Sequence, residues 1–160
     1  MSENLIIGIS DWKVCKSPGV LVTYALGSCV GTCIIDRASG IAGLSHIMLP
    51  DSTQSSGGQI NRMKFADTAL SDMVDKMIAM GAQKARLQAK IAGGALMFAT
   101  KNDSFNIGER NVAAVRAKLS AMRIPIVASA TGENYGRTVL FYSENGVLEI
   151  KSAVKGIEKI

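Results

Sequence analysis

The chain has 160 residues, of which 48% are hydrophobic and 19% are charged, and it carries a net charge of +5 with a pI of about 9.2. This composition supports a folded core and argues against disorder, and the length fits one domain over residues 1–160. The N-terminal residues do not read as a signal peptide and no apolar run reaches the roughly 20 residues that span a bilayer, so we expect a cytoplasmic protein without membrane insertion.

The first fifty residues predict a β-rich half. Ser17-Pro18-Gly19 and Ser39-Gly40 are turn signals, and Pro50 ends the apolar run before it. The pair Gly27-Ser28 interrupts a long apolar, β-branched stretch. The runs on either side of Ser39-Gly40 are expected to form a hairpin. Strands are therefore predicted at residues 5–9, 12–15, 20–26, 30–36 and 41–49.

The second half predicts helices alternating with further strands. Over residues 60–80, apolar side chains recur at spacings of three and four, which is typical of an amphipathic helix. Gly81 stands where a C-cap belongs, and Asn106 is suited to cap a second helix through Met122. Asn145-Gly146 predicts a hairpin turn. Further strands are predicted at residues 86–92, 126–130, 138–142 and 147–151.

These elements predict the α+β class. The sequence has no internal repeat and no linker, so two main helices and about eight strands are expected in layers, if residues 20–26 and 30–36 count as one strand interrupted at Gly27-Ser28. The methionines of the first helix recur on its apolar face, and we interpret them as core residues rather than as a cofactor site.

The positive charge does not by itself identify a partner. Lysines and arginines are scattered along the chain, and only one tryptophan and three tyrosines accompany them. Because single-stranded nucleic acid binds on aromatic stacking platforms, no nucleic-acid partner is predicted. The three cysteines are an odd number in a chain large enough to fold without disulfides, which favours free thiols in a reducing compartment.

The residues that could perform chemistry are few. His46 is the only histidine, so a histidine base acting near neutral pH would have to be this residue. Cys29 follows Gly27 and Ser28 at a break in an apolar stretch, where successive N–H groups could stabilise an oxyanion. Cys33 lies inside a continuous apolar run and is expected to be a buried thiol. The pattern favours a nucleophilic pair of Cys29 and His46.

A zinc site is the main competitor for these side chains. Cys29, Cys33 and His46 offer three ligands, but the spacing is not Cys-x-x-Cys and no fourth ligand is evident. We therefore expect neither a metal nor a cofactor. A glycine-rich nucleotide-binding fingerprint is also absent from the sequence.

A cysteine–histidine pair needs a third group to orient the imidazole. Asp36, Asp51 and Thr23 are the candidates. Their spacing from His46 does not choose among them.

Two segments of the sequence resemble the CheD family of chemoreceptor glutamine deamidases. The first is Thr23-Tyr-Ala-Leu-Gly-Ser-Cys29-Val-Gly and the second is Ile41-Ala-Gly-Leu-Ser-His46-Ile-Met-Leu-Pro50. The Gly-Ser-Cys and His-x-Met-Leu-Pro motifs at this separation are highly specific. The resemblance covers nearly the whole chain, with further matches in family order at residues 64–67, 90–98, 106–111 and 136–137.

The resemblance implies a layered α+β sandwich with mixed sheets and a cysteine hydrolase activity. By motif position, Cys29 is the nucleophile, His46 the general base and Thr23 the third member, and we expect Ser28 and Gly27 to support the oxyanion. The implied reaction converts glutamine to glutamate on methyl-accepting chemotaxis receptors through a thioester, with glutamyl methyl esters as a second substrate. The family also implies binding to the phosphatase CheC.

One departure from the family keeps an alternative open. Where the family often reads Asp-x-Gly-Gly-x-x-Gly-Arg, this chain reads Ala130-Thr-Gly-Glu133-Asn-Tyr-Gly-Arg137. The missing acidic residue and glycine put in doubt any substrate or partner contact made by that loop. The alternative is a non-catalytic adaptor that binds chemoreceptors and CheC.

Overall fold

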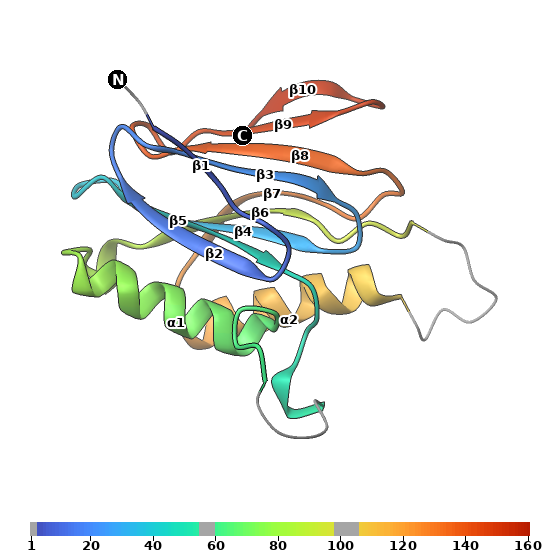
Figure 1. The fold of residues 1–160 in the computed structure, drawn as a ribbon, viewed down its shortest axis with the longest axis horizontal. Coiled ribbons are helices and arrows are strands. Elements are labelled where there is room, and N and C mark those ends of the chain that lie inside the picture. The colour runs from blue at the N-terminus through green and yellow to red at the C-terminus, as the bar shows by residue number, and fades with distance from the viewer. Residues whose placement is uncertain (1–2, 55–59, 98–105) are drawn as a thin grey trace.

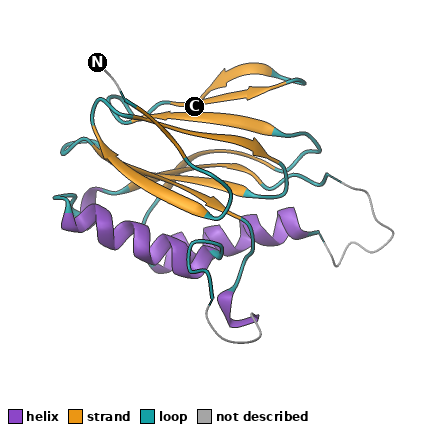
Figure 2. Ribbon diagram, viewed as in Figure 1, coloured by secondary structure: helices purple, strands orange, loops and turns teal. Residues whose placement is uncertain are grey.

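The computed structural model describes residues 3–54, 60–97 and 106–160, which fold into three layers (Figures 1 and 2). Two mixed five-stranded sheets lie face to face, and two helices cover one of them. We call the sheet in the order β1-β3-β8-β9-β10 the outer sheet and the sheet in the order β2-β5-β4-β6-β7 the helix-facing sheet. This architecture confirms the predicted class, an α+β layered sandwich with mixed sheets and two main helices.

Each sheet has five strands. Those of the outer sheet are β1 (Asn4–Ile6), β3 (Val20–Leu26), β8 (Arg137–Tyr142), β9 (Leu148–Ser152) and β10 (Gly156–Lys159). Those of the helix-facing sheet are β2 (Asp11–Lys16), β4 (Val30–Asp36), β5 (Ile41–Ile47), β6 (Gln88–Gly93) and β7 (Ile126–Thr131). The helices are α1 (Ala66–Ala79) and α2 (Ile107–Ala121), with short 3-10 turns at Ser52–Gln54 and Lys84–Arg86.

The two predicted hairpins are confirmed. Strands β4 and β5 pair antiparallel around the turn at Gly40, whose φ is +72°. Strands β8 and β9 pair antiparallel around Asn145-Gly146, where Gly146 has φ +74°. In both turns a glycine adopts the left-handed conformation that side chains with a Cβ avoid.

The break at Gly27-Ser28 does not interrupt a single strand but separates two strands of different sheets. Strand β3, which precedes it, belongs to the outer sheet, and β4, which follows it, belongs to the helix-facing sheet. The bend therefore carries the chain from one layer to the other. Cys29 lies at this crossing point, between the end of β3 and the start of β4.

Two predictions from the sequence were wrong: one strand was not predicted, and the first helix begins later than expected. Strand β10 is a short edge strand with one apolar residue, Ile157, followed by Glu158 and Lys159, so no apolar period marks it. Helix α1 begins at Ala66 and not at residue 60, because Phe65 is extended, with φ −107° and ψ 142°, and forms a bridge with Leu49. Gly81 follows the C-cap as predicted, and the N–H of Ala82 bonds the carbonyl of Met77.

Helix α2 begins as predicted. The side chain of Asn106 accepts a hydrogen bond from the N–H of Glu109, which satisfies one of the free donors of the first turn. The helix ends at Ala121, four residues before Pro125, and Arg123 adopts φ +59° just after it. The ending is therefore a left-handed cap rather than a break caused by the proline.

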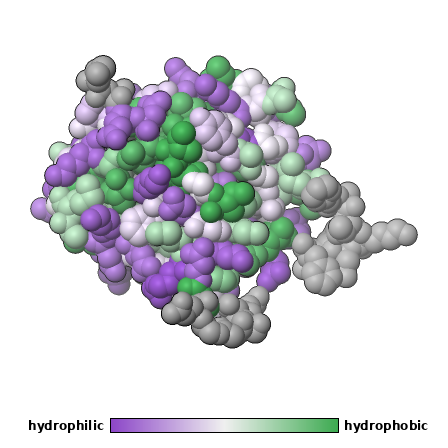
Figure 3. Space-filling model, in the orientation of Figure 1, coloured by the Kyte–Doolittle hydropathy of each residue, from purple (hydrophilic) through white to green (hydrophobic). Residues whose placement is uncertain are grey.

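Two apolar clusters hold the layers together. One fills the space between the sheets, and the other lies between the helix-facing sheet and the helices. Met73 and Met77 belong to the second cluster and are fully buried, which confirms their interpretation as core residues. In the view of Figure 3 the surface is a mixture of hydrophilic and hydrophobic residues. No helix among the described residues is long and apolar enough to cross a membrane.

Candidate active site

The imidazole of His46 meets Thr23 across the two sheets. His46 lies on β5 and is 1% exposed, and Thr23 lies on β3 of the opposite sheet and is fully buried. The distance from Thr23 Oγ1 to His46 Nδ1 is 2.7 Å. Thr23 Oγ1 also lies 2.7 Å from the carbonyl oxygen of Ile7, to which it donates. One hydroxyl therefore links the histidine to the backbone at the edge of the outer sheet.

These two bonds determine the tautomer of His46. The hydroxyl of Thr23 has a single proton, and the carbonyl of Ile7 can only accept it. Thr23 Oγ1 must then accept a hydrogen bond from His46, which places the imidazole proton on Nδ1. The other nitrogen, Nε2, is buried and has no hydrogen-bond partner among the described residues. It is left with a free lone pair, as a general base requires.

A distortion in β3 lies directly beside Thr23. The register with β8 shifts between Thr23 and Leu26, and Ala25 adopts φ +57°. Such bulges bend a strand and re-aim its side chains. Here the irregular stretch leads from Thr23 into the bend that carries Cys29.

Cys29 lies on the same side of the helix-facing sheet as His46. Gly31 pairs with His46 on neighbouring strands, so both face the space between the sheets. Cys29 stands two residues before Gly31 and packs against the apolar cluster in that space. Its side chain is half-buried, so the thiol is neither sealed in the core nor freely exposed.

The thiol and the imidazole are near neighbours but do not form a hydrogen bond. If the β4–β5 register is extended by one pair, Cys29 is diagonal to His46, a relation in which residues lie roughly 7–8 Å apart. Within the described part of the chain, no hydrogen bond joins Cys29 Sγ to His46 Nε2. The free protein therefore holds both groups on one face of the sheet without a hydrogen bond between them.

The backbone of the bend is held by its carbonyl groups. The carbonyl of Gly27 accepts from the N–H of Ala95, and that of Cys29 accepts from the N–H of Gly94, each at 2.9 Å. The carbonyl of Ser28 accepts from the side-chain amide of Asn111 at 3.0 Å. By contrast, the N–H groups of residues 27–29 have no acceptor among the described residues. Unpaired N–H groups at a bend are suited to stabilise an oxyanion.

Burial shifts both ionisable groups toward their neutral forms. It lowers the pKa of His46 from 6.5 to about 4, and it raises the pKa of the Cys29 thiol above its ordinary value of 9.0. At neutral pH the free protein thus holds a thiol and a neutral imidazole, not an ion pair.

The pKa of His46 predicts how stability depends on pH. Between pH 6.5 and about 4 the unfolded chain binds a proton at His46 that the folded protein does not, so the free energy of unfolding should fall as the pH is lowered, by at most about 1.4 kcal/mol per pH unit. Above pH 6.5 the imidazole is neutral in both states and adds no slope. Urea unfolding of the protein and of His46→Asn across this window measures the contribution, and equal slopes for the two would contradict it.

The two aspartates considered as partners of His46 are engaged elsewhere. Asp36 is fully buried at the far end of β4 and forms a bidentate salt bridge with Arg86, with both N–O distances at 2.8 Å. That guanidinium holds the pKa of the Asp36 carboxyl well below its usual range. Asp51 accepts from the N–H of Thr53 in an exposed turn. Of the three candidates, only Thr23 meets the imidazole.

The zinc alternative gains no support from the described residues. They contain no group of three or more histidine, cysteine, aspartate or glutamate side chains that could hold a metal ion. Cys33 is 1% exposed in the cluster between the sheets, and burial raises the pKa of its thiol far above the ordinary value. Cys33 is therefore a core residue, as expected from its apolar run.

The loop that departs from the family adopts the conformation in which glycine is usual. Gly132 and Glu133 have φ values of +83° and +61°. The carbonyl of Glu133 accepts from the N–H of Leu96, and the buried Arg137 donates to the carbonyl of Gly132 and lies over the ring of Tyr135. Glu133 thus occupies a strained position while its carbonyl still anchors the segment after β6.

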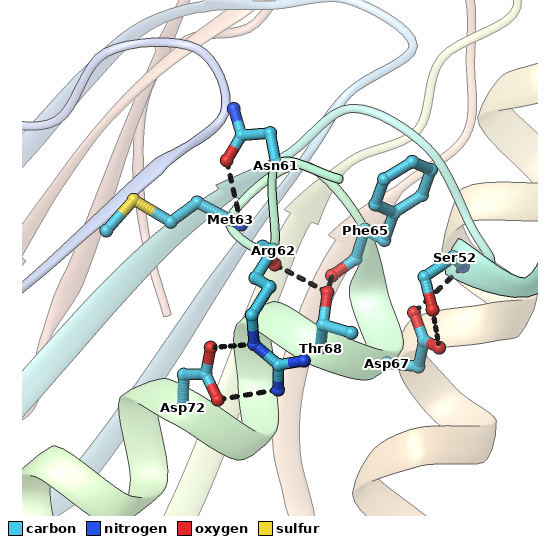
Figure 4. Close-up of polar contacts among 8 residues, drawn as sticks. All are labelled: Ser52, Asn61, Arg62, Met63, Phe65, Asp67, Thr68 and Asp72. Carbon is cyan, nitrogen blue, oxygen red and sulfur yellow. Dashed lines mark hydrogen bonds and ion pairs between the residues drawn. The ribbon is translucent and has the colours of Figure 1, made fainter. Parts of the chain in front are cut away.

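The chain leaving His46 is fastened to the start of α1 (Figure 4). Ser52 donates to the carboxylate of Asp67 at 2.6 Å, and Arg62 pairs with Asp72 at 2.8 Å. Thr68 donates to the carbonyl of Arg62. These contacts close the loop after β5 onto the helix. The N–H groups of Met48 and Leu49, which follow His46, both donate to the carbonyl of Lys64.

Comparisons with known proteins show which family the chain is similar to. The family model described as CheD chemotactic sensory transduction matches residues 48–152. A probable chemoreceptor glutamine deamidase CheD from Caldanaerobacter subterraneus is 49% identical over 99% of both chains, and one from Lachnoclostridium phytofermentans is 46% identical over the whole of both. The chemoreceptor glutamine deamidase CheD of Bacillus subtilis is 43% identical over 96% of this chain and 94% of its own.

The solved structures that resemble the fold include one from Neisseria meningitidis. The crystal structure of the Neisseria meningitidis protein NMB0706, of the family DUF152, aligns with a TM-score of 0.54 over 88% of this chain and 75% of its own. Its sequence identity is 10%, so the similarity concerns the arrangement of sheets and helices alone.

Proposed function

The chain belongs to the CheD family, and on that basis we propose that it is an amidohydrolase that converts glutamine side chains of a chemotaxis receptor to glutamate. The observation that carries the chemistry is the 2.7 Å hydrogen bond between Thr23 and His46. It leaves the Nε2 lone pair free on the same face of the sheet as Cys29. In this proposal Cys29 is the nucleophile, His46 the base and Thr23 the group that orients the base.

The reaction begins with a neutral pair, because burial disfavours both charged forms. Rotation of the Cys29 side chain and binding of the substrate bring the thiol within hydrogen-bond reach of His46 Nε2. His46 Nε2 takes the thiol proton as the sulfur bonds to the side-chain amide carbon of a glutamine. The carbonyl oxygen becomes an oxyanion, and the unpaired N–H groups of Ser28 and Cys29 donate to it, with Gly27 leaving room for its approach.

The second half of the reaction reverses these roles. The imidazolium of His46 gives its proton to the amide nitrogen, the carbon–nitrogen bond breaks and ammonia leaves. The acyl group is now a thioester on Cys29. His46 removes a proton from a water molecule, whose oxygen attacks the thioester, and glutamate and the free thiol are released. A glutamyl methyl ester would follow the same path with methanol as the leaving group.

The substrate follows from the family, and the charge of the chain suits it. The relatives are named for chemoreceptors, so we propose the cytoplasmic part of a methyl-accepting receptor as the substrate and the cytoplasm as the site of action. The net charge of +5 favours approach to glutamate-rich receptor helices. Binding to CheC is a further part of the proposal and rests on the family resemblance.

Mass spectrometry of a purified receptor tests this function. Incubation with the protein should raise the mass of specific receptor peptides by about one dalton for each amide that becomes an acid, with one ammonia released per conversion. The adaptor alternative is favoured by the loop at Ala130 and Glu133 that departs from the family, and by the missing hydrogen bond between Cys29 and His46 in the free protein. An adaptor would bind the receptor and leave its mass unchanged.

A further inference from the structure

Asn111 joins the two segments that carry the proposed nucleophile and base. It lies near the start of α2 and is fully buried. Its side-chain nitrogen donates to the carbonyl of Ser28 and to the carbonyl of Met48, each at 3.0 Å. Ser28 directly precedes Cys29, and Met48 follows His46 by two residues. One amide group therefore spans both sides of the site from the helix side of the sheet.

The orientation of this amide is determined by its surroundings. If its oxygen and nitrogen were exchanged, the oxygen would face two carbonyl oxygens and no proton would lie between them. The oxygen Oδ1 is instead buried without a partner among the described residues. Burying Oδ1 without a hydrogen bond destabilises the folded protein, and the two hydrogen bonds that the side-chain nitrogen donates must offset this loss.

The bond to Ser28 controls the direction of the Cys29 N–H. The carbonyl of Ser28 and the N–H of Cys29 belong to one peptide unit, and in a trans peptide they point in opposite directions. Only the Ser17–Pro18 bond is cis among the described residues. Because Asn111 draws the carbonyl toward α2, the N–H of Cys29 points away from α2, toward the side of the sheet that carries the Cys29 and His46 side chains.

We propose that Asn111 is a positioning residue that orients the Ser28–Cys29 peptide so that the Cys29 N–H can donate to the oxyanion. This inference deepens the proposed function and rests on Cys29 being its nucleophile. Asn111 does not touch the substrate in this account, and it acts through the peptide that it holds. The bonds from Ala95 and Gly94 hold the flanking carbonyls of Gly27 and Cys29, and Asn111 supplies the one anchor between them that comes from a side chain.

Two reagents distinguish a misdirected Cys29 N–H from a bend that has lost its structure. p-Nitrophenyl acetate acylates a thiol through a tetrahedral oxyanion, whereas iodoacetamide alkylates it by direct displacement without one. In Asn111→Leu, which keeps the bulk and removes both donors, the acylation rate of Cys29 should fall by about 10²-fold. The alkylation rate of Cys29, followed by mass spectrometry, should stay within about two-fold of the unchanged protein, since an oxyanion donor plays no part in displacement.

Matched variants keep the test decisive if Asn111→Leu does not fold. Asn111→Ser can donate one of the two bonds and should give an intermediate acylation rate with unchanged alkylation. Val115→Ala removes a buried side chain from the same helix without touching the bend, and it should alter neither rate. Equal changes in both rates, or no change in either, would overturn the proposal. Neither reagent is a receptor, so this test does not depend on the receptor assay. If the receptor's mass did not change on incubation with the protein, that result would count against the proposed function and not against the role of Asn111.

Discussion

Replacing Cys29 by alanine is expected to abolish conversion of receptor glutamines, with a loss of about 10⁴-fold or more in kcat. The sulfur forms the bond to the substrate, and alanine has no nucleophilic group to replace it. Effects in such a unit are not additive, so His46→Asn should lose nearly as much and the double variant little more. The measurement is the gain of about one dalton in receptor peptides over time, with ammonia release as a second readout.

Controls for this experiment come from the same sheet. Cys33→Ala removes a thiol that is buried between the sheets and should retain most of the activity. Thr23→Val keeps the shape of the side chain and removes the acceptor of the His46 proton, so its loss should lie between those of Cys33→Ala and Cys29→Ala. Undiminished conversion by Cys29→Ala would refute the assignment of the nucleophile.

Gly93→Ala is expected to destabilise the protein by about 2–5 kcal/mol and to disturb the bend of Cys29. Gly93 has φ +106°, where a Cβ is disfavoured by about 1–2 kcal/mol. A Cβ there would lie 2.3 Å from the carbonyl oxygen of Cys29, so backbone must move, at a cost of about 1–3 kcal/mol more. Urea unfolding gives the loss of stability, and iodoacetamide labelling of Cys29 reports the displaced bend.

Gly132→Ala separates the two causes. Gly132 also has a positive φ, +83°, but a Cβ there meets nothing within 4 Å. This variant should lose only the conformational share, about 1–2 kcal/mol, with Cys29 labelled at the original rate. If both variants lose the same stability, the close approach of Gly93 to Cys29 has no energetic consequence.

The local elements were predictable because local chemistry decides them. Asn106 caps α2 through a bond to a residue three positions away, and Gly81 ends α1 through the conformation that it alone tolerates at low cost. The hairpin turns at Gly40 and Gly146 follow the same logic. The edge strand β10 was not predictable, since its pairing with β9 comes from the neighbouring strand and not from its own pattern.

The candidate nucleophile and base were also visible in the sequence. His46 is the only imidazole in the chain, and Cys29 stands at a bend formed by Gly27 and Ser28. What the sequence did not indicate is that this bend carries the chain between two sheets, and that Asn111, about eighty residues later, holds its middle carbonyl. The only signal for Asn111 was its place in a segment that resembles the family.

The amino-acid sequence alone thus determined the class of fold and most of the elements, and it predicted the two candidate reactive groups, because each depends on residue type and on neighbours a few positions away. Residue spacing left Thr23, Asp36 and Asp51 open as partners of His46, and the family resemblance implied Thr23. The tertiary structure shows the contact itself. Thr23 and His46 come from different sheets, and their contact exists only because the two layers pack face to face. Asp36, on the same strand pair as His46, turns instead to Arg86 at the opposite end. A contact across layers is set by how whole sheets stack, and spacing along one chain carries no record of it.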